Sequence, residues 1–159
     1  MKITIICVGK IKEKFYSQAI AEYSKRLSRY CKLEITEVAD EKTPDGAGEN
    51  LERQIKEKEG ERILAKIAEG SYTIALAIDG KMPDSVGLSK KLDRLGIGGV
   101  SHINFIIGGS LGLSGQVLEK ADEKLSFSAM TFPHQLMRVI LLEQIYRSYR
   151  IIHGEPYHK

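Results

Sequence analysis

The sequence predicts an α/β protein with a mostly parallel sheet flanked by helices. The hydrophobic period switches repeatedly between two and about 3.6 along the chain, which indicates strands alternating with helices. Residues 72–78 and 102–107 are short, nearly continuous apolar runs, typical of central strands covered on both faces. The chain has 159 residues, 42% of them hydrophobic, as in an ordinary globular protein. We therefore expect residues 1–159 to form one domain.

The N-terminal elements follow from local patterns. Residues 2–8 are apolar and β-branched, which predicts a buried strand that ends at Gly9. Apolar residues recur every four positions from Phe15 to Leu27, which predicts a helix over residues 13–29. Residues 33–38 alternate in polarity, so we expect a strand exposed on one side, at an edge of the sheet.

The remaining elements are expected after the turn-rich residues 43–48. Gly60 is expected to loosen the first of these elements, a charged helix over residues 49–68. Pro133 is typical of the first turn of a helix and marks the start of the last element, over residues 133–152. In order, we expect a helix over 49–68, a strand over 72–78, a helix marked by Leu88, Leu92 and Leu95, a strand over 102–107, a helix over 117–122, a strand over 125–127 and a helix over 133–152.

Several classes of protein are excluded. The apolar runs are far shorter than the roughly 18 residues of a membrane helix, and the N-terminal run is too short for a signal peptide. We therefore expect no membrane span and a cytosolic location. Cys7 and Cys31 show no metal-ligand or redox spacing, so we expect two packed thiols and no metal site.

The formal net charge is only +3, but the charges are unevenly distributed. Residues 1–32 carry 8 basic and 2 acidic residues, whereas residues 33–69 carry 6 and 11. If the first loop and first helix lie together, the basic residues form one phosphate-facing surface; otherwise they are a solvated helix face. These residues are Lys10, Lys12, Lys14, Lys25, Arg26, Arg29 and Lys32.

Ligands of parallel sheets bind beyond the carboxyl ends of the strands, which directs attention to three loops, residues 79–83, 108–115 and 128–133. Gly108 and Gly109 directly follow a buried strand, so they permit either a tight turn or the close approach of a ligand. The glycine spacing matches neither a dinucleotide fingerprint nor a P-loop, which argues against NAD and ATP. We expect Gly108 to lie where a side chain would collide with a ligand.

Residues 126–132 are small and apolar and precede Pro133, so their backbone groups are expected to lack internal partners. Backbone N–H and C=O groups can pair with the edge of adenine while Phe127, Met130 and Phe132 enclose its faces. The alternative is ordinary core packing of these side chains.

The segment from Gly108 to Gly112 also spells G-x-S-x-G, the nucleophile elbow of serine hydrolases, with Ser110 as the nucleophile. An elbow needs a helix directly behind its serine, and Gly112, Ser114 and Gly115 disfavour one here. Serine hydrolase is thus a second hypothesis. Its possible triad partners are Asp122, Glu143, His134, His153 and His158.

Four segments together carry a resemblance to a known family: residues 1–10, 108–113, 125–134 and 154–159. They resemble the bacterial ribosomal RNA large subunit methyltransferase H family over essentially the whole chain. The resemblance implies a SPOUT-class homodimer with a C-terminal trefoil knot and with its active site at the subunit interface. It also implies that S-adenosylmethionine is used to methylate N3 of a pseudouridine in 23S ribosomal RNA of assembled ribosomes.

The resemblance also implies the site residues. Cofactor contacts are expected at Leu76, Gly108, Phe127, Ser128, Ala129, Met130, Thr131 and Phe132. Two positions depart from the family pattern: Ala77 stands where many members have an acidic residue, and Leu111 where a polar residue is common. A non-catalytic ribosome-binding protein that kept only the fold is a third hypothesis.

Five further residues are candidates for catalysis or RNA binding. His134 is expected in the first turn of the last helix, where the helix dipole favours a neutral ring that can accept a proton; a structural histidine is the alternative. Arg138, Tyr157, His158 and Lys159 are expected to grip phosphate and stack on a base, because RNA recognition combines cations with aromatic faces. The alternative for the tail is disorder.

Overall fold

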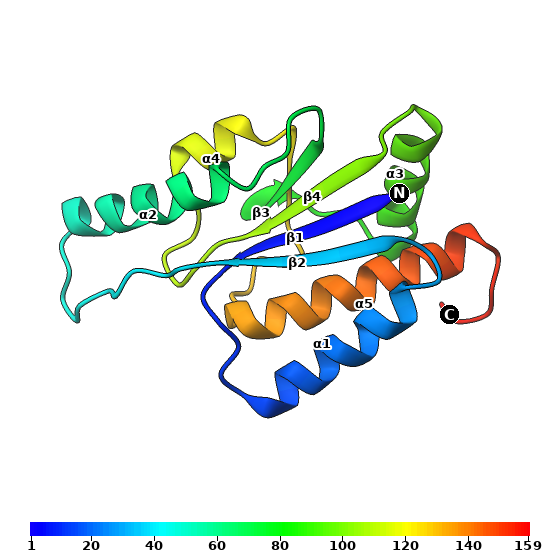
Figure 1. Cartoon of the computed structure of the whole chain (residues 1–159), viewed down its shortest axis with the longest axis horizontal. Coiled ribbons are helices and arrows are strands. Elements are labelled where there is room, and N and C mark those ends of the chain that lie inside the picture. Colours follow the sequence, from blue (N-terminus) through cyan, green and yellow to red (C-terminus); the bar gives the residue numbers. More distant parts are fainter.

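The computed structural model describes residues 1–159 and shows a five-stranded sheet between two groups of helices (Figure 1). The strands are β1 (Lys2–Val8), β2 (Lys32–Val38), β3 (Tyr72–Lys81), β4 (His102–Ile107) and β5 (Glu123–Leu125). The helices are α1 (Lys14–Leu27), α2 (Glu49–Leu64), α3 (Ser85–Ile97), α4 (Gly115–Lys120) and α5 (His134–Ile152).

All neighbouring strands of the sheet are parallel, in the order β2-β1-β4-β3-β5. The predicted α/β class and the edge position of β2 are therefore confirmed. The N-terminal strand β1 lies between β2 and β4, in register with β4 from Lys2 opposite His102 to Cys7 opposite Ile107. The trefoil knot stays a prediction from the resemblance.

Side chains that alternate along the strands build two cores. Ile3, Ile5 and Cys7 pack into the larger core with α1, α3 and α5, whereas Ile6 and Val8 pack with α2 and α4 on the other face. Burial on both faces explains why the strands read as continuous apolar runs. Cys7 is a packed thiol, as expected, and burial raises its pKa to about 11.

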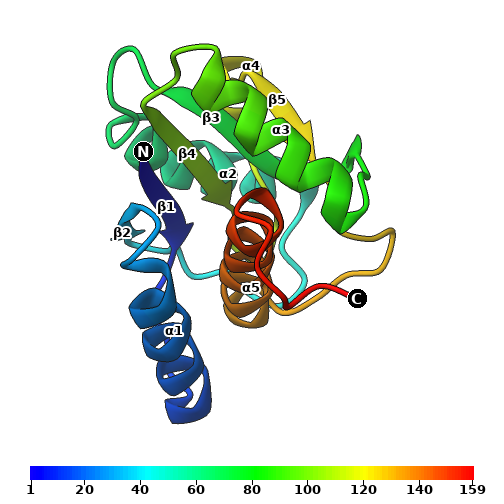
Figure 2. The same ribbon diagram turned by 90° about the vertical axis from the view of Figure 1, so that its right-hand side faces the viewer.

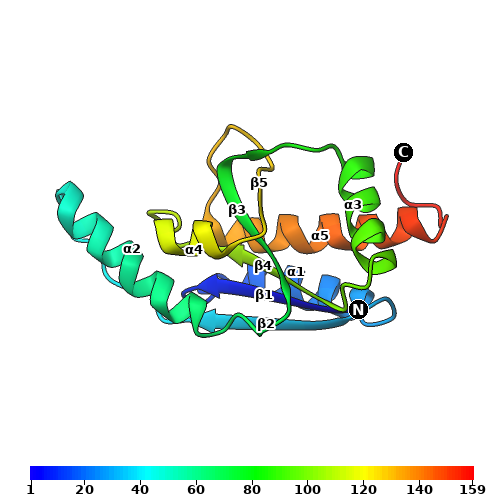
Figure 3. The ribbon, with the colours of Figure 1, turned by 90° about the horizontal axis from the view of Figure 1, so that it is seen from above.

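The helices cover the two faces unequally. On the larger core α5 lies between α1 and α3 (Figure 2), while α4 packs against α2 on the opposite face (Figure 3). No helix combines the length and the apolar character that crossing a bilayer requires.

Two strands differ from the predicted bounds. β3 continues beyond Ile78 to Lys81, so residues 79–81 are not the loop that we expected. The register shifts along this extension, and a Cβ on Gly80 would lie 2.7 Å from the backbone nitrogen of Leu125. β5 ends at Leu125 rather than beginning there, because Glu123 pairs with Ile74, and this leaves Phe127 outside the sheet.

The prediction that Gly60 loosens its helix was wrong. α2 runs through Gly60, and a Cβ there would lie 2.4 Å from Oγ of Ser114, so the glycine lets α4 approach. α2 then ends at Leu64, earlier than predicted. α4 starts at Gly115, before residue 117, because Oγ of Ser114 accepts a hydrogen bond from the Val117 amide. α1 is shorter than the predicted 13–29.

The basic residues of the first segment do not form one surface. Lys10, Lys12 and Lys14 lie at the N-terminal end of α1, and the other four lie at its C-terminal end. A helix of 14 residues separates the two groups by about 21 Å. The expected phosphate-facing surface is therefore split into two groups. Only the group at the start of α1 lies next to the N-terminus of α5, where the Lys12 amide donates a hydrogen bond to Gln135 Oε1 at 3.1 Å.

Arg138 does not lie on the surface as a phosphate-binding residue must. Its side chain is 2% exposed, and its guanidinium contacts three groups at the carboxyl ends of β1 and β2. The guanidinium donates to Glu37 Oε2 at 2.6 Å and to the carbonyl oxygens of Val8 and Gly9 at 3.2 and 2.7 Å. Arg138 was predicted to bind RNA because the amino-acid sequence alone does not show which side of the last helix faces the sheet.

We expect Arg138→Met to lower the free energy of unfolding by about 3 kcal/mol, because removing one partner of a buried ion pair costs roughly 3–5 kcal/mol and Glu37 keeps access to water. Urea unfolding followed by circular dichroism measures the change. The matched variant Glu37→Gln keeps an acceptor for Arg138, so its loss should be near 1 kcal/mol. Equal losses in the two variants would contradict this role of Arg138.

Candidate functional site

A pocket of about 730 Å³ opens beyond the carboxyl ends of β3, β4 and β5 and reaches the N-terminus of α5. This is the edge of the sheet where a ligand was expected. The volume is within the usual range of sites for small molecules and cofactors. Its lining residues are Leu76, Ala77, Ile78, Ile107, Gly108, Gly109, Ser110, Leu111, Gly112, Leu113, Leu118, Leu125, Ser126, Phe127, Ser128, Met130, Thr131, Phe132, Pro133, His134 and Met137.

The pocket brings together the cofactor-binding residues expected from the resemblance, with the exception of Ala129, which does not line it. His134 lines the same pocket. Sequence reasoning missed Leu118 and Met137 as wall residues. Met137 carried a usable signal, because it lies three positions after His134 and so on the same side of α5.

The loop after β4 is held by its own backbone. Gly109 accepts a hydrogen bond from the Gly112 amide at 3.1 Å, and Gly112 has a φ of +88°, which favours glycine. A Cβ on Gly108 would lie 2.8 Å from the carbonyl carbon of Gly112. Gly108 is therefore already required by the turn, and the side chain that we expected to collide with a ligand would first collide with this loop.

The loop that precedes α5 offers free backbone groups. The amides of Phe127, Ser128, Thr131 and Phe132 donate to no protein atom, whereas the Met130 amide donates to Ser128 Oγ at 3.0 Å. Phe127 lines the pocket and also packs against the larger core, while Met130 is 74% exposed. Unpaired donors beside apolar walls suit a planar heterocycle such as adenine.

The N-terminus of α5 adds a second set of free donors. Pro133 is the N-cap and provides no side-chain cap, so the amides of His134, Gln135 and Leu136 remain unpaired. Such amides favour a carboxylate. Burial lowers the pKa of His134. The positive charges of Arg138 and Lys12 lower this pKa further, whereas the negative charge of Asp40 raises it in part. The ring is therefore held neutral, which allows it to accept a proton.

The pocket does not assemble the serine hydrolase. Ser110 lies exposed on the turn, and α4 begins only at Gly115, so no helix N-terminus stands directly behind the serine. Asp122 instead accepts a hydrogen bond from the Thr73 amide near the start of β3, at the end of the strand away from the pocket. Glu143 is bound to the C-terminal tail.

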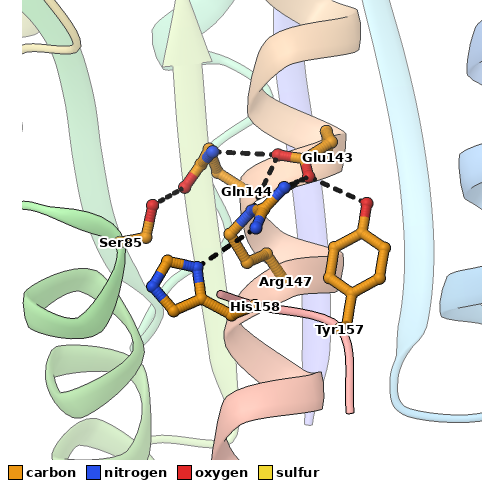
Figure 4. Close-up of polar contacts among 6 residues, drawn as sticks. All are labelled: Ser85, Glu143, Gln144, Arg147, Tyr157 and His158. Carbon is orange, nitrogen blue, oxygen red and sulfur yellow. Dashed lines mark hydrogen bonds and ion pairs between the residues drawn. The ribbon is translucent and has the colours of Figure 1, made fainter.

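The tail, residues 153–159, folds back on α5 rather than being disordered (Figure 4). Tyr157 donates to Glu143 Oε1 at 2.9 Å, and its ring lies 4.7 Å from the guanidinium carbon of Arg147. Arg147 also bonds His158 Nδ1 at 3.1 Å. Burial and the hydrogen bond to Glu143 raise the pKa of Tyr157 to about 12. Lys159 is exposed.

The tail and the pocket occupy opposite ends of α5 (Figure 1). Counted along the helix axis, Glu143 lies about 14 Å and Arg147 about 20 Å from His134. Within one chain, Tyr157, His158 and Lys159 therefore do not reach the pocket that contains His134. No group of three or more His, Cys, Asp or Glu side chains is placed to hold a metal ion.

Comparison with known proteins gives a consistent result. A family model described as "Predicted SPOUT methyltransferase" matches residues 1–158. The chain is 66% identical to ribosomal RNA large subunit methyltransferase H of Bifidobacterium adolescentis, 64% to the protein of that name from Clostridium novyi and 61% to that from Clostridium tetani. Each alignment extends over 159 residues and covers 100% of both chains.

We expect Ser110→Ala to leave the pocket unchanged, because the hydroxyl makes no hydrogen bond within the protein and the residue is exposed. Its free energy of unfolding should stay within about 0.5 kcal/mol of the wild type. A fluorophosphonate probe should label neither protein in an intact-mass measurement, with a known serine hydrolase as the positive control. An adduct on the wild type that Ser110→Ala abolishes would restore the hydrolase hypothesis.

Proposed function

The chain belongs to the SPOUT methyltransferase family, and on this premise we propose that it transfers a methyl group from S-adenosylmethionine to N3 of a pseudouridine in 23S ribosomal RNA of the assembled ribosome. Full-length relatives named ribosomal RNA large subunit methyltransferase H support this substrate. The proposal includes a single domain over residues 1–159, a homodimer and a cytoplasmic location.

The convergence of one strand end and two loops in one pocket carries this proposal. Leu76 at β3, the turn after β4 and the segment before α5 come from separate parts of the chain, yet they enclose one volume of about 730 Å³. Free amides and apolar walls suit adenine, and the N-terminus of α5 suits a carboxylate. S-adenosylmethionine contains both groups, so the residues present fit it.

When bound, the cofactor supplies an electrophilic methyl group on a sulfonium. The protein's task is then to hold a ring nitrogen in line with that methyl, and positioning alone can supply on the order of 7–11 kcal/mol. The backbone turn from Gly108 to Gly112 and the segment 127–132 hold the cofactor. The neutral ring of His134 is the group in the pocket able to accept the N3 proton.

The RNA contact needs groups that the pocket lacks. Lys10, Lys12 and Lys14 are exposed next to the N-terminus of α5, where they can pair with phosphates. Tyr157, His158 and Lys159 offer an aromatic face and cations, but they lie at the other end of α5. We therefore propose that the tail of one subunit serves the pocket of its partner.

Isothermal calorimetry tests cofactor binding, with Gly108→Val and Gly115→Ala as a pair. Valine at position 108 collides with the Gly112 backbone and displaces the loop, so S-adenosylmethionine affinity should fall by at least about tenfold, or 1.4 kcal/mol. Gly115 has open space around its missing Cβ, so alanine there should bind normally. Absence of binding by the wild type at millimolar cofactor would overturn the proposed function.

Deletion of residues 157–159 should leave cofactor affinity nearly intact but lower methyl transfer to ribosomes by about 10²-fold or more, as expected for lost positioning. Tritiated S-adenosylmethionine measures the transfer. In mixed dimers of a tail-deleted subunit with a Gly108→Val subunit, activity should exceed that of either homodimer. If it does not, each subunit works with its own tail.

A further inference from the structure

Glu59 is a buried acid to which the proposed reaction gives no role. It lies in the third turn of α2 and is 5% exposed, whereas the other glutamates in the middle of this helix, Glu57 and Glu61, are exposed. A buried carboxyl group is costly unless its contacts compensate for the lost water. Burial accordingly raises the pKa of Glu59. Its contacts therefore indicate what the residue does.

The carboxyl group of Glu59 bridges two loops. Oε2 accepts a hydrogen bond from the Glu41 amide at 3.0 Å, in the connection between β2 and α2. On the other side lies Gly109, whose missing Cβ would be 3.2 Å from Oε1 of Glu59 and 3.3 Å from Cγ1 of Val8. Gly109 is thus enclosed between the carboxyl group and β1.

Gly60, the next residue of α2, contacts the other end of the same pocket loop. Its missing Cβ would lie 2.4 Å from Oγ of Ser114 and 3.2 Å from a methyl carbon of Val117. Ser114 caps α4 and ends the segment that begins at Gly108. Two successive residues of α2 therefore lie beside the beginning and the end of segment 108–114, whose residues 108–113 line the pocket.

We propose that Glu59 is a positioning residue that presets the 108–114 loop for the cofactor. Through its hydrogen bond to the Glu41 amide it is fixed in place, and its carboxyl group then limits where Gly109 can lie. A preset loop binds more tightly because less conformational freedom is lost on binding. The inference rests on the proposed function only in naming S-adenosylmethionine as the ligand; the contacts with the loop are independent of it.

The first experiment uses Glu59→Ala, Glu59→Gln and the matched control Glu57→Ala. Without ligand, hydrogen exchange in peptides covering residues 108–114 should be at least about tenfold faster in Glu59→Ala and unchanged in Glu57→Ala, because local opening controls exchange. The KM for S-adenosylmethionine should rise about tenfold, while kcat at saturating cofactor stays within about twofold. Glu59→Gln keeps the size and an acceptor for the Glu41 amide, so it should stay within about threefold of the wild type.

The second experiment approaches the same contact from Gly109. Gly109→Ala adds a methyl that presses on Glu59 and should weaken cofactor binding. In Glu59→Ala/Gly109→Ala this methyl gains room, so the double variant should bind better than independent effects predict. Additive effects would show that the carboxyl group does not position the loop.

The results separate this inference from the proposed function. If the wild type fails to bind S-adenosylmethionine, the proposed function fails, and exchange in the ligand-free protein still tests Glu59. If loop exchange and KM are the same in Glu59→Ala and the wild type, the positioning role is wrong even where the methyltransferase activity is present. Equal losses in Glu59→Gln and Glu59→Ala would assign the effect to charge and overturn the proposal. Should Glu59→Ala not fold, Glu59→Gln and Gly109→Ala provide the decisive pair.

Discussion

The buried guanidinium of Arg138 fixes α5 against the sheet, and the candidate site depends on this contact. Arg138 ties the first turns of α5 to the carbonyl oxygens of Val8 and Gly9 and to Glu37. His134 lies one turn earlier on the same helix, so the ion pair also determines where this ring and the free amides of the helix start are presented. The same positive charge helps to keep the His134 ring neutral. One buried cation thus sets the geometry of that side of the pocket and adds to the effect of burial in lowering the pKa of His134.

The opposite side of the pocket depends on close backbone approaches that small residues permit. Gly60 lets α4 approach α2, and Gly80 lets β3 approach the backbone of β5. A side chain at either position would push apart the elements on which the 108–114 loop and Phe127 depend. The pocket is therefore a product of close backbone contacts made at several points of the chain, which explains why its walls come from such distant segments.

Period and polarity were enough to predict the order of the elements, the parallel sheet and the edge position of β2, because burial on one or two faces leaves a direct trace in sequence. Two of the three loops at the carboxyl ends of the strands, residues 108–115 and 128–133, were predictable for the same reason, whereas residues 79–81 extend β3 instead. The role of Arg138 was not, because α5 is apolar on more than one side and the ion pair joins residues 101 positions apart. Gly60 was misread because a glycine that admits a neighbouring helix looks the same in sequence as one that weakens its own helix.

The separation of the tail from the pocket constrains how a complete site can form. The pocket includes the start of α5, whereas the tail packs on the far half of this 19-residue helix, so the helix holds them apart within one chain. In a dimer whose two-fold axis passes beside the middle of α5 and perpendicular to it, each helix would run antiparallel to its partner, and the same operation would place each tail beside the other pocket. The Glu143, Arg147 and Tyr157 network orders the tail before any RNA arrives. The helix that separates the two halves of the site in one subunit would then join them in the dimer.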